Sequence, residues 1–405
     1  MRLTSPGPTL GVVGGGQLGR MLGEAAGPLG VSVVVSDPTP DCPASPVVAD
    51  QLVGDFDDYG TLRALAERAD VLTYEIELAD PDTLAAVSEE TGTPVHPTPD
   101  TLRTIQDKLV QNERFDDAGV PLPDYRRVDD AEDLRDAGDD LGWPVMLKAR
   151  TGGYDGRGNV PVANPEDAEA ALAEVGAGEG GALAERMVDF DREMAIIGVR
   201  GADGETDAFP VTETIHEDEI MRETVSPART DGAVRERARE VALDVLDALE
   251  GRGVFGIELF ERSSRSDDGR SSGHRPRAGG EILLNEVAPR PHNSGHWTIE
   301  GAVTSQFEQH VRAVLGLPLG STERRCPTVM ANVLGDVQEP TRAELTGVED
   351  LLAADGTHLH WYGKREVRPL RKMGHVTLTA DGAGTRDVEE LLERVAERRD
   401  DLTFA

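Results

Sequence analysis

The sequence has few cysteines, few lysines and little positive charge for its length of 405 residues. Two cysteines, Cys42 and Cys326, are too few for a disulfide framework or a cysteine metal cage, which fits a reducing cytoplasm. The sequence contains no apolar run long enough to span a bilayer and no signal-peptide core. We therefore expect a cytoplasmic protein of two or three domains without membrane contact.

Basic residues are outnumbered, because 41 lysines and arginines face 76 aspartates and glutamates for a formal net charge of −35. This balance argues against nucleic acid and anionic membranes as partners. The acidic residues are spread along the whole chain and are not gathered in a tail. Such a distribution indicates a halophilic protein from a salt-rich cytoplasm, where screening relieves the self-repulsion.

Lysine is the rarer of the two basic residues, with only four among the 41. Biased codon usage would deplete lysine everywhere, but the four that remain all fall in stretches that other features mark for phosphate binding. Lysine supplies a compact point charge where the planar fork of arginine does not fit. The candidate phosphate ligands are therefore Lys108, Lys148, Lys364 and Lys372.

The first hundred residues predict a parallel βαβ domain that begins with a Rossmann-like turn. A strand at 9–13 precedes Gly14, Gly16 and Gly19, and a helix begins near Gln17. This spacing is typical of dinucleotide sites, yet a tight strand-to-helix turn needs glycine with or without a phosphate. Further predicted elements are strands at 31–37, 71–74 and 94–96 and a helix at 61–69, with Glu75 and Glu77 at the ligand-binding edge of the sheet.

Two short apolar runs each carry a glutamate. The run 254–260 contains Glu258, and the run that begins at Glu281 ends with Asn285 and Glu286. If the runs pair as a hairpin, both carboxylates can lie on one face, because side chains alternate along a strand. Carboxylate and amide oxygens suit Mg²⁺, with phosphate and water completing its shell. The alternative is a strand end with solvated charges.

Two other stretches gather side chains that bind anions or react. After Glu286, a loop stiffened by two prolines presents Arg290, His292, Asn293 and His296. Near the C-terminus, five cations fall within nine residues of a very acidic chain, which favours an anion pocket over a solvated surface. These cations are Lys364, Arg365, Arg368, Arg371 and Lys372.

Residues 144–160 predict a strand that ends at Lys148 and then a glycine-rich loop. The loop holds Tyr154, Asp155 and Arg157 among four glycines. Backbone N–H groups of such a loop can approach phosphates, and the loop can close as a lid. The residue order of a Walker A loop is absent, and a plain glycine hairpin is the alternative.

The remaining patterns predict further helices and strands. A helix from Thr101 carries Lys108, and a polar strand pair at 182–187 and from Arg192 onward carries Glu185 and Glu193. Apolar residues at spacings of three and four predict a helix at 230–250, which we expect to be scaffolding together with 303–315. Residues 262–280 are low in apolar residues and predict a solvated hairpin extension, with His274 as a loop residue.

Together these motifs resemble the ATP-grasp ligases, and more narrowly the 5-(carboxyamino)imidazole ribonucleotide synthetases of purine biosynthesis. The resemblance covers nearly the whole chain in order. It rests on GGGQLGRM (14–21), TYEIE (73–77), KARTGGYDGRGN (148–159), AERMVDFDREMAII, FGIELF, NEVAPRPHNSGHWT and YGKREVRPLRKMGHV (362–376). In that family the first domain is related to Rossmann folds but binds no NAD. The chain departs from the family pattern at Leu370, where glycine is usual, and in the long 262–280 insertion.

The resemblance implies an α/β fold, with α+β character in the ATP-grasp part. It places a Rossmann-like domain at 1–100, an ATP-grasp domain at 101–325 with a mobile lid at about 113–184, and a small β-rich domain at 326–405. It also implies a homodimer that uses ATP and Mg²⁺ to carboxylate 5-aminoimidazole ribonucleotide with bicarbonate, through carboxyphosphate. The expected products are 5-(carboxyamino)imidazole ribonucleotide, ADP and phosphate.

The resemblance further implies a role for each matching residue. ATP would be bound by Lys108, Lys148, Gly153, Tyr154, Asp155, Gly156, Arg157, Gly158, Asn159, Glu185, Arg186, Met187, Val188, Glu193, His216, Asn285 and Glu286. The ribonucleotide and bicarbonate would be framed by Gln17, Glu75, Tyr154, Asp155, Arg157, Arg290, His292, Asn293, Lys364, Arg371 and Lys372. Glu258 and Glu286 would hold magnesium, and the catalytic residues would be Arg290, His292, Asn293 and Lys364.

Three alternative functions remain open on the sequence. An ATP-grasp carboxylase or ligase with a different acceptor would keep most of the motifs, because only the 288–296 loop and the basic C-terminal cluster favour a ribonucleotide. An NAD-dependent dehydrogenase would use the glycine turn and leave Glu258 and Glu286 without a role. A non-catalytic sensor would bind the nucleotide without releasing phosphate.

The net charge generates a prediction about salt. A chain with a charge of −35 repels itself unless ions screen it, and the Debye length falls from about 10 Å at 0.1 M to about 3 Å at 1 M salt. We therefore expect a higher Tm in 1 M than in 0.1 M sodium chloride, measured by circular dichroism. A Tm that stays flat or falls across this range would contradict the halophilic interpretation.

Overall fold

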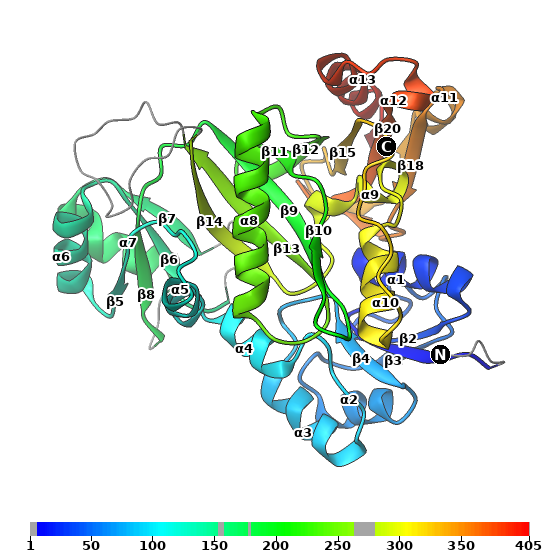
Figure 1. Ribbon diagram of the computed structural model, residues 1–405, viewed down its shortest axis with the longest axis horizontal. Coiled ribbons are helices and arrows are strands. Elements are labelled where there is room, and N and C mark those ends of the chain that lie inside the picture. Colours follow the sequence, from blue (N-terminus) through cyan, green and yellow to red (C-terminus); the bar gives the residue numbers. More distant parts are fainter. Residues whose placement is uncertain (1–5, 153–157, 177–179, 263–279, 405) are drawn as a thin grey trace.

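The computed structural model describes residues 6–152, 158–176, 180–262 and 280–404 (Figure 1). The expectations for the loop 153–157 and for the insertion 263–279, including His274, lie outside these ranges. The strands form a parallel sheet near the N-terminus, a small antiparallel sheet in a lateral lobe, and a long sheet that runs from the centre into the C-terminal part. This arrangement confirms the expected mixed α/β class with a β-rich C-terminal part.

The N-terminal sheet is parallel, with the strand order β3-β2-β1-β4. Its strands are β1 (Thr9–Val13), β2 (Ser32–Asp37), β3 (Asp50–Val53) and β4 (Val71–Tyr74), and its helices are α1 (Gln17–Ala26), α2 (Tyr59–Ala66) and α3 (Pro81–Thr91). Asp58 caps α2 by accepting a hydrogen bond from Thr61 N, so this helix begins and ends earlier than predicted. The strand predicted at 94–96 is a single parallel bridge between Leu72 and Val95.

The lateral lobe contains an antiparallel sheet in the order β5-β8-β6-β7, and it stands apart at the left of Figure 1. Its elements are β5 (Tyr125–Val128), α6 (Ala131–Leu141), β6 (Val145–Ala149), β7 (Asn159–Val162), α7 (Ala168–Val175) and β8 (Ala182–Arg186). The two helices pack their apolar faces on the sheet around Leu134 and Leu147, which gives the lobe a core of its own. Ala149 and Asn159, which lie on either side of the glycine-rich stretch, therefore belong to this lobe.

The single helix predicted from Thr101 is wrong, because the structure has α4 (Pro99–Gln106) and α5 (Lys108–Asp117) with a break at Asp107. The Asp107 carboxylate accepts from Leu109 N at 3.0 Å and caps α5. It also pairs with Arg150 at 2.5 Å, in the segment that follows β6. The break thus places Lys108 at the first turn of a helix that is tied to the lateral lobe.

The central sheet is antiparallel in the order β14-β13-β9-β11-β12-β15-β20-β18, with β10 beside β9. Its strands are β9 (Arg192–Arg200), β10 (Thr206–Ala208), β11 (Thr212–Glu217), β12 (Ile220–Ser226), β13 (Gly253–Arg262), β14 (Glu281–Ala288), β15 (Thr328–Leu334), β18 (Thr357–Trp361) and β20 (Lys372–Thr379). Because β12 pairs with β15, the sheet continues across the boundary expected near residue 325. The domain boundaries expected near residues 100 and 325 stay a prediction.

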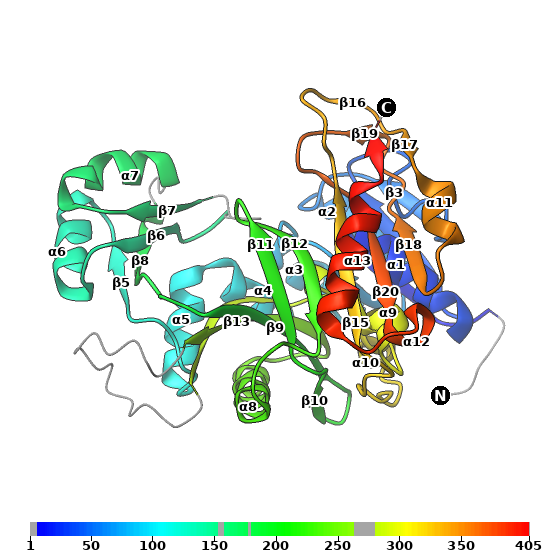
Figure 2. The ribbon, with the colours of Figure 1, turned by 90° about the horizontal axis from the view of Figure 1, so that it is seen from above.

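Helices cover the central sheet at both ends (Figure 2). The long α8 (Gly232–Ala248) packs on β9, β13 and β14, and α13 (Val388–Asp400) packs on β15 and β20. Between the sheet and α1 lies α10 (Gln306–Leu315), which begins later than the predicted Val303 because Ser305 caps it. None of the described helices is long and apolar enough to cross a membrane.

Short elements complete the chain. They are the 3₁₀ turns Gly27–Leu29, Pro165–Asp167 and Asn293–Gly295, the helices α9 (Thr298–Gly301), α11 (Val348–Ala353) and α12 (Ala380–Ala383), and the two-residue strands β16 (Thr341–Arg342), β17 (Leu345–Thr346), β19 (Glu366–Val367) and β21 (Thr403–Phe404). The pairs β16–β19 and β17–β21 tie the C-terminal segments to one another.

His310 on α10 joins the N-terminal sheet to the central sheet. It is fully buried, its Nε2 lies 2.8 Å from Thr73 Oγ1, and Val254 N donates to its Nδ1 at 3.2 Å. An Nδ1 that accepts requires the neutral tautomer with the proton on Nε2. Burial, and to a lesser extent the nearby His96, lowers the pKa of His310 to about 3.

This depressed pKa generates a prediction about acid stability. The histidine of the unfolded chain titrates near pH 6.5, so the unfolded state binds one more proton than the folded state as pH falls below that value. The stability from neutral His310 is therefore present above about pH 6.5 and is lost below it, by about 1.4 kcal/mol per pH unit. His310→Gln should flatten the fall in unfolding free energy between pH 6.5 and 4, measured by urea denaturation.

The matched control is His358→Gln, which changes an exposed histidine on β18. Its slope with pH should equal that of the unmodified protein. If His310→Gln and the unmodified protein lose stability with the same slope, His310 is not the buried neutral group described above.

Candidate active site

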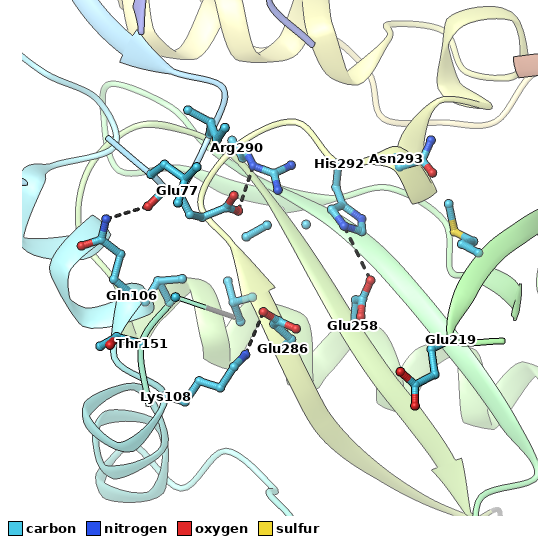
Figure 3. Close-up of a pocket in the computed structure, with 18 of the residues that line it drawn as sticks. Glu77, Gln106, Lys108, Thr151, Glu219, Glu258, Glu286, Arg290, His292 and Asn293 are labelled. Carbon is cyan, nitrogen blue, oxygen red and sulfur yellow. Dashed lines mark hydrogen bonds and ion pairs between the residues drawn. The ribbon is translucent and has the colours of Figure 1, made fainter. Parts of the chain in front are cut away.

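A cavity of about 370 Å³ lies where the central sheet meets the N-terminal sheet and the α4–α5 junction (Figure 3). Its walls come from the segment after β4, from α4 and α5, from the segment after β6, from the β11–β12 hairpin, and from β13, β14 and the following loop. It brings together eight of the residues predicted from the sequence. These are Lys108, His216, Glu258, Glu286, Arg290, His292, Asn293 and Lys372.

The hairpin predicted for the two glutamate runs is confirmed, since β13 and β14 pair antiparallel with Glu258 directly opposite Glu286. The prediction that Asn285 and Glu286 end the strand is wrong, because β14 continues to Ala288. The register shifts after Glu258 so that Leu259 faces Leu284, which leaves Asn285 as the extra residue of a β-bulge. A bulge re-aims the side chains beside it.

The bulge lets two consecutive residues meet two lysines. Lys148 Nζ lies 3.4 Å from Asn285 Oδ1, and Lys108 Nζ lies 3.0 Å from Glu286 Oε1. In a regular strand, consecutive side chains point to opposite faces. Lys148 also pairs with Glu185 on β8 at 2.6 Å within the lateral lobe, so its contact with Asn285 links this lobe to the hairpin.

Two carboxylates that face each other strongly affect one another's protonation. Burial raises the pKa of Glu258 to about 7, and the charge of Glu286 adds to this effect. Burial alone would also raise the pKa of Glu286, but the charge and hydrogen bond of Lys108 outweigh it and lower that pKa. The Glu286 side chain is 47% exposed, and it faces the cavity. The pair is therefore open to a ligand that brings positive charge.

The donor set fits Mg²⁺ only in part. Two carboxylates and the amide oxygen of Asn285 are hard oxygen ligands, as Mg²⁺ prefers. Among the described residues, no group of three or more histidines, cysteines and acidic residues could hold a metal ion. The protein thus offers one or two carboxylates, which is the protein share found where substrate phosphates and water complete the octahedron.

The proline-stiffened loop after β14 is held from several sides. Arg290 Nε lies 2.8 Å from Glu77 Oε1, and His292 Nε2 lies 3.6 Å from Glu258 Oε1 (Figure 3). The Gln306 side chain accepts from His292 N at 2.9 Å and donates to His292 O at 2.7 Å. Asn293 forms hydrogen bonds with Asn332 on β15. The loop is therefore rigid through side-chain contacts as well as through proline.

Sequence analysis missed several of these supports. Glu77 was noted only as a residue at the edge of β4, and Gln306 and Asn332 carried no local signal in the sequence. Both are fully buried polar residues on a helix and a strand that otherwise show apolar patterns. Glu219, in the β11–β12 turn with φ of 62°, also lines the cavity and was not predicted.

His216 and Glu193 form a pair on neighbouring strands. His216 Nδ1 lies 2.6 Å from Glu193 Oε2, where β11 pairs with β9. Burial disfavours the imidazolium, but the hydrogen bond to Glu193 outweighs it and raises the pKa of His216. The histidine lines the cavity and Glu193 supports it from outside the lining.

The basic C-terminal cluster is divided. Lys372 lines the cavity, and Lys364 Nζ donates to the Lys372 backbone carbonyl at 2.6 Å. Arg365 pairs with Asp41 at 3.0 Å on the surface, and Arg368 pairs with Glu366. Arg371 donates to the Glu366 carbonyl at 2.7 Å. The prediction that all five cations form one anion pocket is thus wrong for Arg365 and Arg368, which pair with acidic residues on the surface.

Leu370, the departure from the family pattern, has φ of 61°. This is the left-handed region, which glycine adopts without a steric penalty and a branched side chain rarely does. The structure therefore gives the physical reason for glycine at this position in the family.

The other predicted residues lie outside the cavity lining. Gln17 begins α1, Arg186 pairs with Asp124 at 3.0 Å, and Met187 and Val188 connect β8 to β9. Gly158 and Asn159 stand at the start of β7, and the Asn159 Oδ1 is buried without a hydrogen-bond partner. Gly153, Tyr154, Asp155, Gly156 and Arg157 lie outside the described residues. The roles of all these residues remain predictions.

The glycine-rich turn at the start of α1 is filled by the protein's own carboxylate. Gly19 N donates to Glu75 Oε2 at 2.7 Å, and Gly16 N donates to Glu75 Oε1. A Cβ at Gly14 would lie 2.4 Å from Glu75 Cγ. Burial raises the pKa of Glu75 to about 7, and the hydrogen bonds from the turn oppose this rise. The place where a dinucleotide phosphate would bind is therefore already taken by an internal anion.

Three family models match successive parts of the chain. The ribonucleotide synthetase preATP-grasp domain matches residues 8–106, the ATP-grasp domain matches 113–307, and the phosphoribosylaminoimidazole carboxylase C-terminal domain matches 328–389. The first model covers the N-terminal sheet, the second covers the lateral lobe and the central-sheet strands from β9 to β14, and the third covers β15, β18 and β20 of the same central sheet.

Similar proteins agree with the models. The N5-carboxyaminoimidazole ribonucleotide synthase of Brucella melitensis biotype 1 is 39% identical over 92% of this chain and 96% of its own length. The N5-carboxyaminoimidazole ribonucleotide synthetase structure from Thermotoga maritima is 41% identical, with a TM-score of 0.83 over 98% of this chain and 99% of that one.

A synthase structure from Aspergillus clavatus, in complex with ADP and 5-aminoimidazole ribonucleotide, is 33% identical, with a TM-score of 0.84 over 98% of this chain and 100% of that one. The chain spans about two thirds of the length of the first curated relatives it matches, at 66% and 65%. By its sequence, its matched domains and its fold, the chain belongs to the N5-carboxyaminoimidazole ribonucleotide synthase family.

Proposed function

We propose that this chain carboxylates 5-aminoimidazole ribonucleotide in purine biosynthesis, at the expense of ATP and bicarbonate. The observation that carries the proposal is the meeting, in one cavity, of the Glu258–Glu286 pair with Arg290, His292 and Asn293. The solved relative with ADP and 5-aminoimidazole ribonucleotide supports the choice of acceptor. An ATP-grasp ligase with another acceptor is the second candidate.

The chemistry takes two steps. A bicarbonate oxygen attacks the γ-phosphorus of ATP, ADP leaves, and carboxyphosphate forms. The exocyclic amine of the ribonucleotide then attacks the carboxyl carbon, the C–O bond to phosphate breaks, and the amine gives up one proton. Phosphoryl transfer depends mainly on positioning and on neutralising charge.

The residues of the cavity, together with Lys148 beside Asn285, match these needs. Lys108 and Lys148 supply point charges for the phosphates of ATP. Arg290, held by Glu77, offers a planar fork suited to the carboxylate of bicarbonate. Glu258 and Glu286 would hold Mg²⁺, which would neutralise negative charge on the phosphates. Carboxyphosphate hydrolyses readily, so a rigid loop and a lobe that closes over the site would keep water out.

The remaining features of the proposal follow from the family and from the sequence. We propose a homodimer, a cytoplasmic location and a halophilic source, together with Mg²⁺ as cofactor and bicarbonate as substrate. Both cysteines are buried free thiols, which fits a reducing compartment. The ribonucleotide phosphate would be taken by Lys364, Arg371 and Lys372.

The direct test measures ADP formation with each substrate omitted in turn. We expect rapid ADP release only when bicarbonate and 5-aminoimidazole ribonucleotide are both present with Mg²⁺. ADP release that ignores the ribonucleotide but responds to another amine would favour the second candidate. Binding of ATP without any turnover would favour the sensor.

Glu286 provides a test of the proposed metal pair. Glu286→Gln keeps the shape of the side chain but removes the charge that faces Lys108 and the proposed metal ion. The turnover number should fall by about 10²-fold or more, the scale of losing one electrostatic stabiliser. The control is Glu281→Gln at the start of β14, outside the cavity lining. Near-normal turnover of Glu286→Gln at saturating Mg²⁺ would refute the metal assignment.

The second prediction concerns Lys372, which lines the cavity. Losing one charge-assisted hydrogen bond costs about 1.5–3 kcal/mol, or about 10- to 150-fold in affinity. Lys372→Ala should raise the KM for the ribonucleotide by that factor and leave ATP affinity of the free enzyme unchanged. Arg368→Ala, on the surface of the same segment, should change neither. Loss of ATP affinity with an intact ribonucleotide KM would assign Lys372 to the ATP site.

A further inference from the structure

Asn332 on β15 is fully buried, does not line the cavity, and touches a residue that does. Its Nδ2 donates to Asn293 Oδ1 at 2.8 Å, and Asn293 Nδ2 donates to Asn332 Oδ1 at 3.1 Å. The Nδ2 of Asn332 also donates to the Met221 carbonyl at 3.0 Å. Two side-chain amides thus face each other, and one of them is tied to a backbone carbonyl.

The backbone carbonyl determines which way both amides point. A carbonyl oxygen only accepts, so the Asn332 atom that contacts Met221 must be the NH₂ group. The remaining atom of the amide, the Asn332 oxygen, then accepts a hydrogen bond from the NH₂ group of Asn293. The amide of Asn293 must then present its oxygen to the remaining Asn332 proton. An ambiguous amide orientation is in this way settled by the hydrogen-bond network.

A count of donors shows what is left for the cavity. An amide has two N–H donors and one carbonyl oxygen. Asn293 uses its oxygen and one N–H on Asn332, and within the described part of the chain no acceptor takes the second N–H. The N–H that bonds to Asn332 lies on the same side of the Asn293 amide as its oxygen. The other N–H therefore points away from Asn332. Asn293 stands on the wall of the cavity near His292 (Figure 3).

We infer that Asn332 is a positioning residue, which fixes the side chain of Asn293 so that it donates an N–H into the cavity and presents no oxygen there. The inference rests on the proposed function, for which the donor suits an oxygen of bicarbonate or of the carboxyphosphate formed from it. Both carry negative charge, which an N–H stabilises and an amide oxygen would repel. Arg290 supplies the neighbouring cation of the same loop.

Asn332→Asp tests the inference with little change in shape. The carboxylate has no N–H for Met221 or for Asn293, so the amide of Asn293 loses its fixed orientation. We expect the turnover number to fall by about 10²-fold, the scale of one lost donor to a developing oxyanion. The KM for ATP should stay unchanged, because the lysines that take its phosphates lie on α5 and β6.

A double-mutant cycle separates positioning from a general structural role. If Asn332 acts through Asn293, then Asn293→Ala together with Asn332→Asp should be no slower than Asn293→Ala alone. Losses that multiply would overturn the inference. Asn332→Ala, which removes the reciprocal pair without burying a charge, gives the same cycle if the aspartate variant does not fold.

The control for a buried carboxylate is Gln309→Glu. Gln309 is also fully buried and bonds reciprocally to the backbone of Gly320, with distances of 2.7 and 2.8 Å. This variant should lose thermal stability and keep the turnover number. An equal loss of turnover in Gln309→Glu would mean that the effect of Asn332→Asp is one of stability.

A readout without turnover distinguishes failure of this inference from failure of the proposed function. The chain has six asparagines, so selective ¹⁵N labelling gives six side-chain amide groups with two N–H signals each. In the unmodified protein, one N–H of Asn293 should exchange slowly with solvent, and in Asn332→Ala, which offers it no acceptor, it should exchange fast. Slow exchange in both would overturn the inference, whatever the enzyme assay shows.

Discussion

The cavity is organised around two carboxylates that face each other across one hairpin and repel each other. Glu258 and Glu286 are held opposite by the pairing of β13 with β14, and burial, reinforced by the charge of Glu286, raises the pKa of Glu258 to about 7. Such a pair is tolerable only beside positive charge. The cations come from separate parts of the chain, with Lys108 at the start of α5 and Lys148 on β6 of the lateral lobe. The charge balance of the hairpin thus links the lobe, the α4–α5 junction and the central sheet.

The same physics explains why the glycine-rich turn is not a dinucleotide site. Backbone N–H groups at the start of a helix attract an anion of any origin. Here Glu75, which follows β4, takes that position and bonds to the turn. The Glu75 side chain thereby joins α1 to the segment after β4 and occupies these two N–H groups of the turn. The glycines are required here by close packing against Glu75.

Much of the site could be predicted from the sequence because its signals are local. Strand alternation gave the hairpin with Glu258 and Glu286 on one face, and the scarcity of lysine pointed to residues that include Lys108 and Lys372 at the cavity. The break at Asp107 could not be predicted, since its cause is a contact with Arg150 over forty residues away in the chain. The bulge at Asn285 likewise depends on the partner strand.

The residues that support the loop after β14 could not be predicted from the sequence either. Gln306 lies in the segment 303–315 that was expected to be scaffolding, and Asn332 lies on a strand that no sequence pattern marked, yet the fold places them against His292 and Asn293. Their signal is burial without an apolar side chain, and burial is a property of the folded state. Roles assigned to the residues 153–157 depend on the family alone.

The central claim is that the energy of ATP activates bicarbonate within this cavity, and the direct measurement is the fate of bicarbonate oxygen. With bicarbonate labelled with ¹⁸O, and with ATP and 5-aminoimidazole ribonucleotide present, the released phosphate should carry one labelled oxygen, as mass spectrometry of the phosphate would show. This result follows because the bridging oxygen of carboxyphosphate leaves with phosphorus. Phosphate that carries no label, formed together with the carboxylated product, would show that ATP activates another group and would contradict the account.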